Sequence, residues 1–164
     1  MRFKQTDAGR SLSSNPHEDS DCTVRALATV ANLQYDEAHA IMRRTGRKFL
    51  GLASMFEGLD TARNDGRLEF EQLKLSLVER IVNAAPGFTM VDGGGAFLQK
   101  RMTEPSLAQF VKTHKRGRYI VRVMTRGSKR IGHVFAIVDG VVHDNERPHG
   151  RRYVKAAWKI EVKA

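Results

Sequence analysis

The chain has 164 residues, of which 41% are hydrophobic and 28% charged, a composition typical of one globular domain. Lys and Arg number 28 against 18 Asp and Glu, so the net charge is +10 and the isoelectric point is near 10.2. A single cysteine excludes an internal disulfide and a multi-cysteine zinc site. No apolar run is long enough to cross a bilayer, and the first residues lack the apolar segment of a secretory signal. We therefore expect a cytoplasmic protein without membrane contact.

The positive charge is spread over several short basic segments. Such charge attracts polyanions, which include nucleic acid and acidic proteins, although a solvated surface without a partner explains it equally well. No zinc-finger spacing, RNA-recognition signature or aromatic run accompanies the charge, so sequence-specific reading of DNA is not expected. The basic segments are 43–48, 112–118, 126–130 and 147–152.

The first half of the chain predicts helices. Apolar residues recur at helical spacing after Cys22, and Ser20 or Asp21 can cap that helix by accepting backbone N–H bonds. Residues 47–66 show no clear pattern. The glycine-rich stretch 88–100 predicts a flexible loop, because it lacks the GK[ST] ending of a phosphate-binding loop. The helices are expected over residues 22–32, 36–46, 68–84 and 103–111, after an irregular segment at 1–19.

The second half changes to the short apolar runs of β-strands. Asp139 and Gly140 lie between two of these runs and form a strong signal for a two-residue hairpin turn. The strands are expected over residues 119–123, 133–138, 141–144 and 153–162. The sequence therefore predicts an α+β fold in a single domain, residues 1–164. Its helical part, at about 20–112, packs on an antiparallel sheet at about 117–162.

Cys22 stands where polar sequence gives way to the first helix. A buried cysteine is often only a small apolar side chain, but at the first turn of a helix the free N–H groups and the helix dipole favour the reactive thiolate. The nearby acidic residues Glu18, Asp19 and Asp21 oppose that charge. A reactive Cys22 therefore needs a neighbouring cation, and an imidazolium is the usual one.

The hairpin around the Asp139-Gly140 turn identifies a candidate imidazole. The turn pairs Val138 with Val141, and side chains then alternate between the two faces of the strands. His133 and Asp144 fall on one face as diagonal neighbours, with backbones roughly 7–8 Å apart and side chains within reach. His143 and Asn145 fall on the opposite face. A carboxylate beside His133 would orient the ring and stabilise its cation, as the third member of a catalytic triad does.

Two other interpretations of these residues remain. The hairpin can be structural, with a histidine that merely has its hydrogen bonds satisfied. A metal site of His133, His143 and Asp144 is disfavoured because the two histidines lie on opposite faces. We therefore expect no metal and no cofactor.

The order of a helix-start cysteine, a strand histidine and an Asp or Asn on the next strand resembles the papain-like cysteine peptidases. The segments DCTVRALATVANLQYDEAHAIMRRTGR and GHVFAIVDGVVHDN are similar to small papain-like proteins encoded by tailed phages and bacteria. They also resemble the leader-cleaving peptidase domains of bacteriocin exporters. The resemblance covers residues 15–48 and 103–146, whereas residues 49–100 match nothing in the family.

The resemblance implies roles for individual residues. Cys22 would be the nucleophile, His133 the general base and Asp144 the residue that orients His133. Family members often carry a Gln upstream of the cysteine that completes the oxyanion hole, and this chain has none there. Asn15, seven residues upstream of Cys22, is the nearest side-chain amide, and the backbone N–H of Cys22 would be the second donor.

Two functions from different classes follow. The first is a papain-like cysteine hydrolase that cleaves a peptide, isopeptide or amide bond of a protein substrate, with deamidation and acyl transfer as related reactions. The second is an inactive papain-like scaffold that binds nucleic acid or a host protein through its basic surface. Either would suit a phage-encoded protein in the cytoplasm of a bacterial host or associated with the virion.

Overall fold

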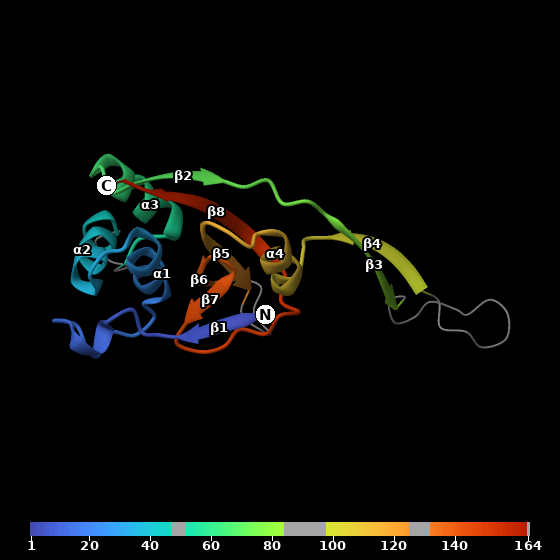
Figure 1. Ribbon diagram of the computed structural model, residues 1–164, viewed down its shortest axis with the longest axis horizontal. Helices are drawn as coiled ribbons and strands as arrows, with labels where there is room; N and C mark the ends of the chain where they lie inside the picture. The colour runs from blue at the N-terminus through green and yellow to red at the C-terminus, as the bar shows by residue number, and fades with distance from the viewer. Residues whose placement is uncertain (47–51, 84–97, 125–131, 164) are drawn as a thin grey trace, which may run out of the picture.

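The computed structural model of this chain describes residues 1–46, 52–83, 98–124 and 132–163. The helices are the 3₁₀-helix η1 (Arg10–Leu12) and the α-helices α1 (Cys22–Ala31), α2 (Tyr35–Thr45), α3 (Met55–Asn64) and α4 (Leu107–Thr113). The strands are β1 (Arg2–Gln5), β2 (Leu68–Gln72), β3 (Val78–Asn83), β4 (Leu98–Thr103), β5 (Arg118–Met124), β6 (Gly132–Val138), β7 (Val141–Asp144) and β8 (Val154–Val162). Figure 1 shows their arrangement.

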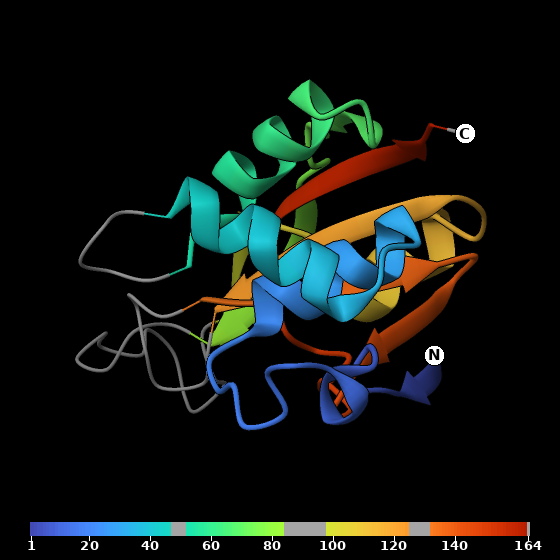
Figure 2. The ribbon, with the colours of Figure 1, turned by 90° about the vertical axis from the view of Figure 1, so that its left-hand side faces the viewer.

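A six-stranded sheet with the order β1-β7-β6-β5-β8-β2 forms the centre of the molecule. All neighbouring strands in it are antiparallel except β1 and β7, which pair in parallel. Helices α1, α2 and α3 cover one face of the sheet, as Figure 2 shows. The predicted α+β class is therefore confirmed, with N-terminal helices packed on a mostly antiparallel sheet.

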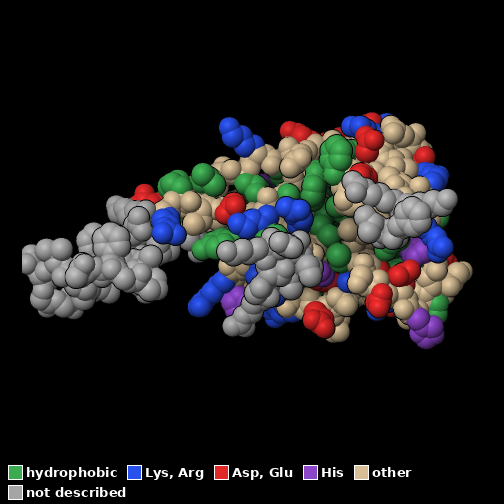
Figure 3. All heavy atoms as spheres, turned by 180° about the vertical axis from the view of Figure 1, so that it is seen from behind, with side chains coloured by type: hydrophobic (Ala, Val, Ile, Leu, Met, Phe, Trp, Pro, Cys, Tyr) green, Lys and Arg blue, Asp and Glu red, His purple; other side chains and the backbone are tan. Residues whose placement is uncertain are grey.

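The remaining two strands, β3 and β4, pair only with each other and form an arm that extends away from the sheet (Figure 1). Figure 3 shows hydrophobic side chains at the surface of this β3–β4 arm. Met102 on β4 is 59% exposed and Leu77, just before β3, is 55% exposed. The arm therefore contributes little to the buried core.

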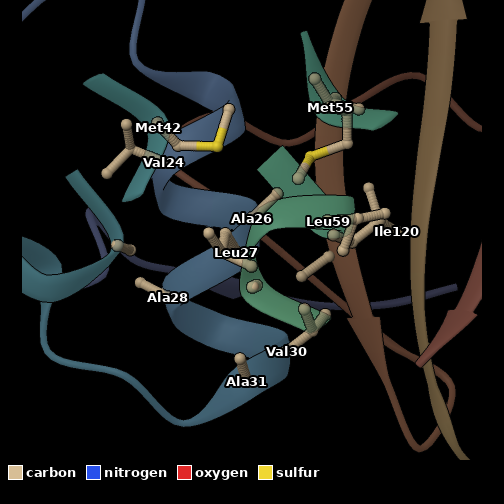
Figure 4. Close-up of a cluster of buried hydrophobic side chains, with 14 of the residues drawn as sticks. Val24, Ala26, Leu27, Ala28, Val30, Ala31, Met42, Met55, Leu59 and Ile120 are labelled. Carbon is tan, nitrogen blue, oxygen red and sulfur yellow. The ribbon is translucent and has the colours of Figure 1, made fainter. Parts of the chain in front are cut away.

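The core between the helices and the sheet is built from the apolar side of α1. Leu27 and Val30 are fully buried there, against Leu59 of α3 and Ile120 of β5 (Figure 4). Burying one such side chain stabilises the fold by about 1.5–3 kcal/mol. Asn32 ends α1 in the left-handed conformation, with φ of 54°, which the short polar side chain of asparagine tolerates. Helix α1, and with it Cys22, is thus fixed on the sheet.

A second apolar cluster lies on the opposite face of the sheet, under α4. Phe110 of α4 packs there with Val121 of β5 and with Phe135 and Ile137 of β6. Strands β5 and β6 are therefore buried on both faces, which explains why their sequences are nearly continuous apolar runs. Of the described residues, no helix is both long and apolar enough to cross a membrane.

The hairpin register agrees with the sequence prediction. Asp139 and Gly140 both have positive φ, 48° and 72°, as a type I′ turn requires. Val138 pairs with Val141, and the ladder continues to the pair Ala136 and His143. The strands expected over 119–123, 133–138, 141–144 and 153–162 are confirmed as β5 to β8. The helix expected over 103–111 begins later, at Leu107, because Ser106 caps it.

Three expectations about the first half are wrong. The helix expected over 68–84 is instead β2 and β3, separated by an extended segment. The segment 1–19 is not wholly irregular, since β1 pairs with β7. The division into a helical part at 20–112 and a sheet part at 117–162 is also wrong. Strands β1 and β2 lie outside 117–162, yet they form the two edges of the main sheet. The unassigned segment 47–66 contains α3. Most of the loop expected at 88–100 lies outside the described residues, and its last three residues begin β4.

Candidate active site

Cys22 is the first residue of α1 and is partly buried beside the larger core cluster. Asp21 is the N-cap residue, but its side chain makes no capping hydrogen bond. The first N–H groups of a helix have no intrahelical acceptor, so those of the first turn of α1 can donate to a group bound at Cys22. The sulfur also accepts a hydrogen bond from the backbone of Val134 on β6.

His133, near the start of β6, hydrogen-bonds both Cys22 and Asp144. Its Nε2 lies 2.6 Å from Oδ2 of Asp144, so Nδ1 is the ring nitrogen left to face the thiol. The side chain of His133 is 27% exposed and that of Asp144 only 2%. A ring held by a buried carboxylate on one side and open to solvent on the other can exchange a proton with a bound substrate.

The contact between His133 and Asp144 confirms the strand-parity prediction. Asn145 is the next residue and was the alternative partner for His133. Its backbone N–H donates to Oδ1 of Asp144 at 2.8 Å. The two-residue turn carries no bulge between Ala136 and His143 that would have exchanged the faces.

The ionisation of the three groups is coupled. Burial is the largest influence on the Cys22 thiol and opposes ionisation. The hydrogen bonds from His133 and Val134 and the positive charges of His133 and Arg25 outweigh it, so the pKa of Cys22 falls below its usual 9.0. The hydrogen bond to Asp144 and then that to Cys22 raise the pKa of His133 to about 9. The lowered pKa of Cys22 and the raised pKa of His133 both favour the pair of a thiolate and an imidazolium.

Asp144 stays ionised despite its burial. Burial is again the largest influence and raises the pKa of Asp144, but His133, Arg25 and the Asn145 backbone together bring that pKa below its usual 3.8. A permanently ionised Asp144 stabilises the imidazolium form of His133 and fixes the plane of its ring.

Arg25 is a site residue that the sequence reasoning missed. It follows Cys22 by three positions on α1 and is buried at 7% exposure. Its Nη1 lies 2.6 Å from Oδ1 of Asp144, and its Nε lies 3.0 Å from Oδ1 of Asp21. One guanidinium thus joins the helix that carries Cys22 to the strand that carries Asp144. The available signal was an arginine inside the apolar run CTVRALATVA, where a buried charge needs acidic partners.

Asp21 extends this network of charges. Its two oxygens accept hydrogen bonds from Arg10 and Arg25 on one side and from the hydroxyl of Tyr35, at 2.8 Å, on the other. Burial and this hydrogen bond raise the pKa of Tyr35 well above its usual 10.0, so Tyr35 remains a neutral donor. Asp21, the acidic residue next to Cys22, is therefore paired with two arginines and does not leave an unpaired negative charge beside the thiol.

Asn15, the side chain that the resemblance assigns to the oxyanion hole, contacts α2. The side-chain amide of Asn15 donates to Oδ1 of Asp36, at the start of α2, at a distance of 3.0 Å. Further along the same segment, Glu18 pairs with the buried ring of His39 at 2.8 Å. These contacts fasten the segment before Cys22 to α2. The bond to Asp36 uses one of the two N–H groups of the Asn15 amide.

His143 lies on β7 opposite Ala136, one position before Asp144. Burial and the positive charges of Lys4 and Arg118 lower the pKa of His143, so it is a neutral ring among cations. Among the described residues, no three His, Cys, Asp or Glu side chains are gathered as a metal would require.

Compared with protein-family models, with curated proteins and with solved structures, the chain matches none of them. Function therefore has to be inferred from the geometry and chemistry of the site itself.

Proposed function

We propose that this chain is a cysteine hydrolase of papain-like fold that cleaves a peptide, isopeptide or amide bond of a protein substrate. The observation that carries the proposal is the chain of contacts from Cys22 through His133 to Asp144. A thiol at a helix start, an imidazole that ionises it and a buried carboxylate behind the imidazole are the parts of an activated cysteine nucleophile.

In the proposed reaction, Cys22 forms and then loses a bond to the substrate, and His133 gives up and then regains a proton. The Cys22 thiolate attacks the carbonyl carbon, and the charge that develops on oxygen is met by N–H groups at the start of α1. The carbon–nitrogen bond then breaks as His133 gives its proton to the leaving nitrogen. Water attacks the acyl-enzyme and passes a proton to His133. Finally the carbon–sulfur bond breaks, which releases the acid and restores the thiolate.

The papain-like assignment rests on two features. The chain order cysteine, histidine, aspartate is that of the family, and the cysteine helix packs on the antiparallel sheet that supplies the other two residues. The backbone N–H groups at the start of α1 would be the donors of the oxyanion hole, and the second N–H of the Asn15 amide, whose first bonds Asp36, would be a further donor.

Digestion of a defined peptide library, followed by mass spectrometry, tests the proposal. The wild-type protein should release amine and acid fragments, and Cys22→Ala should release none. Addition of hydroxylamine should trap the acyl group as a hydroxamate. A product with only a side-chain amide converted to acid would identify deamidation, and a protein that leaves the library unchanged would contradict the proposal.

The net charge of +10 favours a second candidate, a scaffold that binds polyanions. Such a protein should bind random-sequence duplex DNA at low salt and lose it steeply as salt rises, because each phosphate contact releases counterions. The two functions separate on one variant: Cys22→Ala should abolish hydrolysis and leave DNA binding unchanged. DNA binding by a protein whose Cys22 is inert would favour the scaffold.

A further inference from the structure

A basic pocket of about 480 Å³ lies where β5 ends and β8 begins. Among the described residues, its lining contains three permanent cations and no carboxylate. Lys155 is paired with Glu104 at 3.0 Å, whereas Arg151 and Arg152 form no ion pair with any described residue. The lining residues are Met124, His149, Arg151, Arg152, Tyr153 and Lys155.

The wall that carries the two arginines is held in place by backbone hydrogen bonds. The N–H of Leu107, at the start of α4, donates to the carbonyl of Arg152 at 2.8 Å, and that of Ala108 donates to Gly150 at 2.9 Å. The N–H of Arg151 also donates to Nδ1 of His149 at 3.1 Å. The guanidinium groups therefore extend from a fixed base, which lowers the entropy that binding must offset.

Strand pairing places this pocket and His133 at the same end of strands β5, β6 and β8. Met124 pairs with Gly132, the residue before His133, and Val123 pairs with His133 on one side and Val154 on the other. Adjacent strands lie about 4.8 Å apart, so the backbone of Val154 lies about 10 Å from that of His133. An extended peptide rises about 3.4 Å per residue and would cover that distance in about three residues.

We propose that this pocket is a specificity subsite that binds an acidic side chain of the peptide substrate, about three residues from the bond that Cys22 attacks. The inference rests on the proposed function, because it takes the substrate to be a peptide positioned by the contact between Cys22 and His133. A carboxylate there pairs with the two arginines that have no acidic partner within the described chain.

A peptide fits this site better than a nucleic acid. Single-stranded nucleic acid is usually held along a charged groove with several aromatic side chains that stack on successive bases. This pocket has one aromatic residue, Tyr153, and the ammonium group of Lys155 already lies 5.8 Å from the centre of its ring. The cations are gathered at one point, which suits a single carboxylate.

Iodoacetyl peptides that alkylate Cys22 provide the test. The probes are iodoacetyl-Gly-Gly-Glu amide, its Gln counterpart, and the same pair with one glycine fewer or more. The proteins are wild type, Arg151→Gln/Arg152→Gln, and Arg43→Gln/Lys112→Gln. The last variant loses the same charge at two exposed positions outside this pocket. Plain iodoacetamide measures the intrinsic reactivity of Cys22 in each.

The wild-type protein should react about five-fold faster with the best Glu probe than with its Gln counterpart, as two partly exposed ion pairs would give. That preference should disappear in Arg151→Gln/Arg152→Gln and persist in the control, while the iodoacetamide rates stay equal. An equal preference in the two double variants would show that general charge attracts the probe and would overturn the proposal.

Binding measured without the reaction separates this proposal from the proposed function. Acetyl-Gly-Gly-Glu amide should shift the backbone amide NMR signals of Arg151, Arg152 and Tyr153 in Cys22→Ala, whether or not Cys22 is catalytic. If it shifts none of them, or if a short oligothymidylate shifts them at lower concentration, the pocket is not an acidic-peptide subsite. If the peptide shifts these signals but the library is not digested, the pocket binds acidic peptides and the proposed hydrolase activity is wrong.

Discussion

Helix α1, which begins at Cys22, and the β3–β4 arm both contain apolar residues but place them in different surroundings. In α1, Val24 and Leu27 are fully buried, and the charged Arg25 is paired with Asp21 and Asp144. In and beside the arm, Leu77 and Met102 are more than half exposed, and Figure 3 shows apolar side chains at the surface of the arm. Apolar sequence therefore predicts neither burial nor function unless a second layer packs on it.

The difference also tells where substitutions should matter. A charge in the α1 region is surrounded by protein, so removing its partner leaves an uncompensated buried ion. A side chain of the arm is surrounded largely by solvent, so removing it changes little. Substitutions in the α1 region should therefore have larger effects than substitutions in the arm.

Asp144→Ala should lower turnover by about 10²- to 10³-fold, because His133 loses the carboxylate that orients it and stabilises its cation. Cys22→Ala should cost more, since it removes the nucleophile. Asn145→Ala should change turnover by less than about two-fold, because only its backbone contacts Asp144. Peptide hydrolysis rates measure all three. Asp144→Asn, which can still accept a bond from His133, should recover part of the loss. A larger effect at Asn145 than at Asp144 would mean that the carboxylate has no part in the reaction.

Arg25→Met should destabilise the fold by about 3–5 kcal/mol, because Asp21 and Asp144 would remain buried without their shared cation. Urea denaturation measures the change. Arg43→Met, an exposed position on α2, is the matched control and should shift stability by less than about 0.5 kcal/mol. Equal effects of the two substitutions would show that Arg25 does not organise the site.

Tyr35→Phe should cost about 1–2 kcal/mol, because it leaves an oxygen of buried Asp21 without its hydroxyl donor. Since Tyr35 and Arg25 share Asp21, the double variant should lose less or more than the sum of the single losses by at least about 0.5 kcal/mol. Urea denaturation of the wild type, the two single variants and the double variant completes this double-mutant cycle. Strict additivity would mean that the two contacts act independently.

Two leucines, one in the core and one beside the arm, test whether the arm contributes less to stability than α1. Leu27→Ala, in the core, should cost about 3 kcal/mol, whereas Leu77→Ala, beside the arm, should cost less than about 0.5 kcal/mol. Thermal denaturation measures both. A large loss for Leu77→Ala would reveal that its side chain packs against something in solution, such as a second copy of the chain.

The sequence predicted those parts of the site that depend on local structure. A two-residue turn fixes the register of its hairpin, so the meeting of His133 and Asp144 followed from counting residues. The helix start at Cys22 was equally local. In contrast, Arg25 and Asp144 are 119 positions apart, and their contact depends on how α1 crosses the sheet. No short-range pattern contains that information.

The error at 68–84 has a similar physical origin. Phe70, Leu73 and Leu77 are spaced as on one side of a helix, yet β2 pairs with β8 and the chain then extends toward the arm. Short apolar runs suit either structure, and tertiary pairing decides between them. The pairing of β1 with β7 escaped prediction for the same reason, since a four-residue edge strand has no signal apart from its partner.

The proposed activity of Cys22 depends most on its ionisation by His133, and the rate of alkylation by iodoacetamide between pH 5 and 10 measures that ionisation directly. In the wild-type protein the thiol pKa lies below its usual value and the pKa of His133 is raised to about 9. The labelling rate should therefore rise at a lower pH than that of a thiol with the usual pKa of 9.0. In His133→Ala, burial acts without that partner, so the rate at neutral pH should fall at least about ten-fold and recover only near or above pH 9. Identical pH profiles for the two proteins, both rising only near pH 9, would contradict the account.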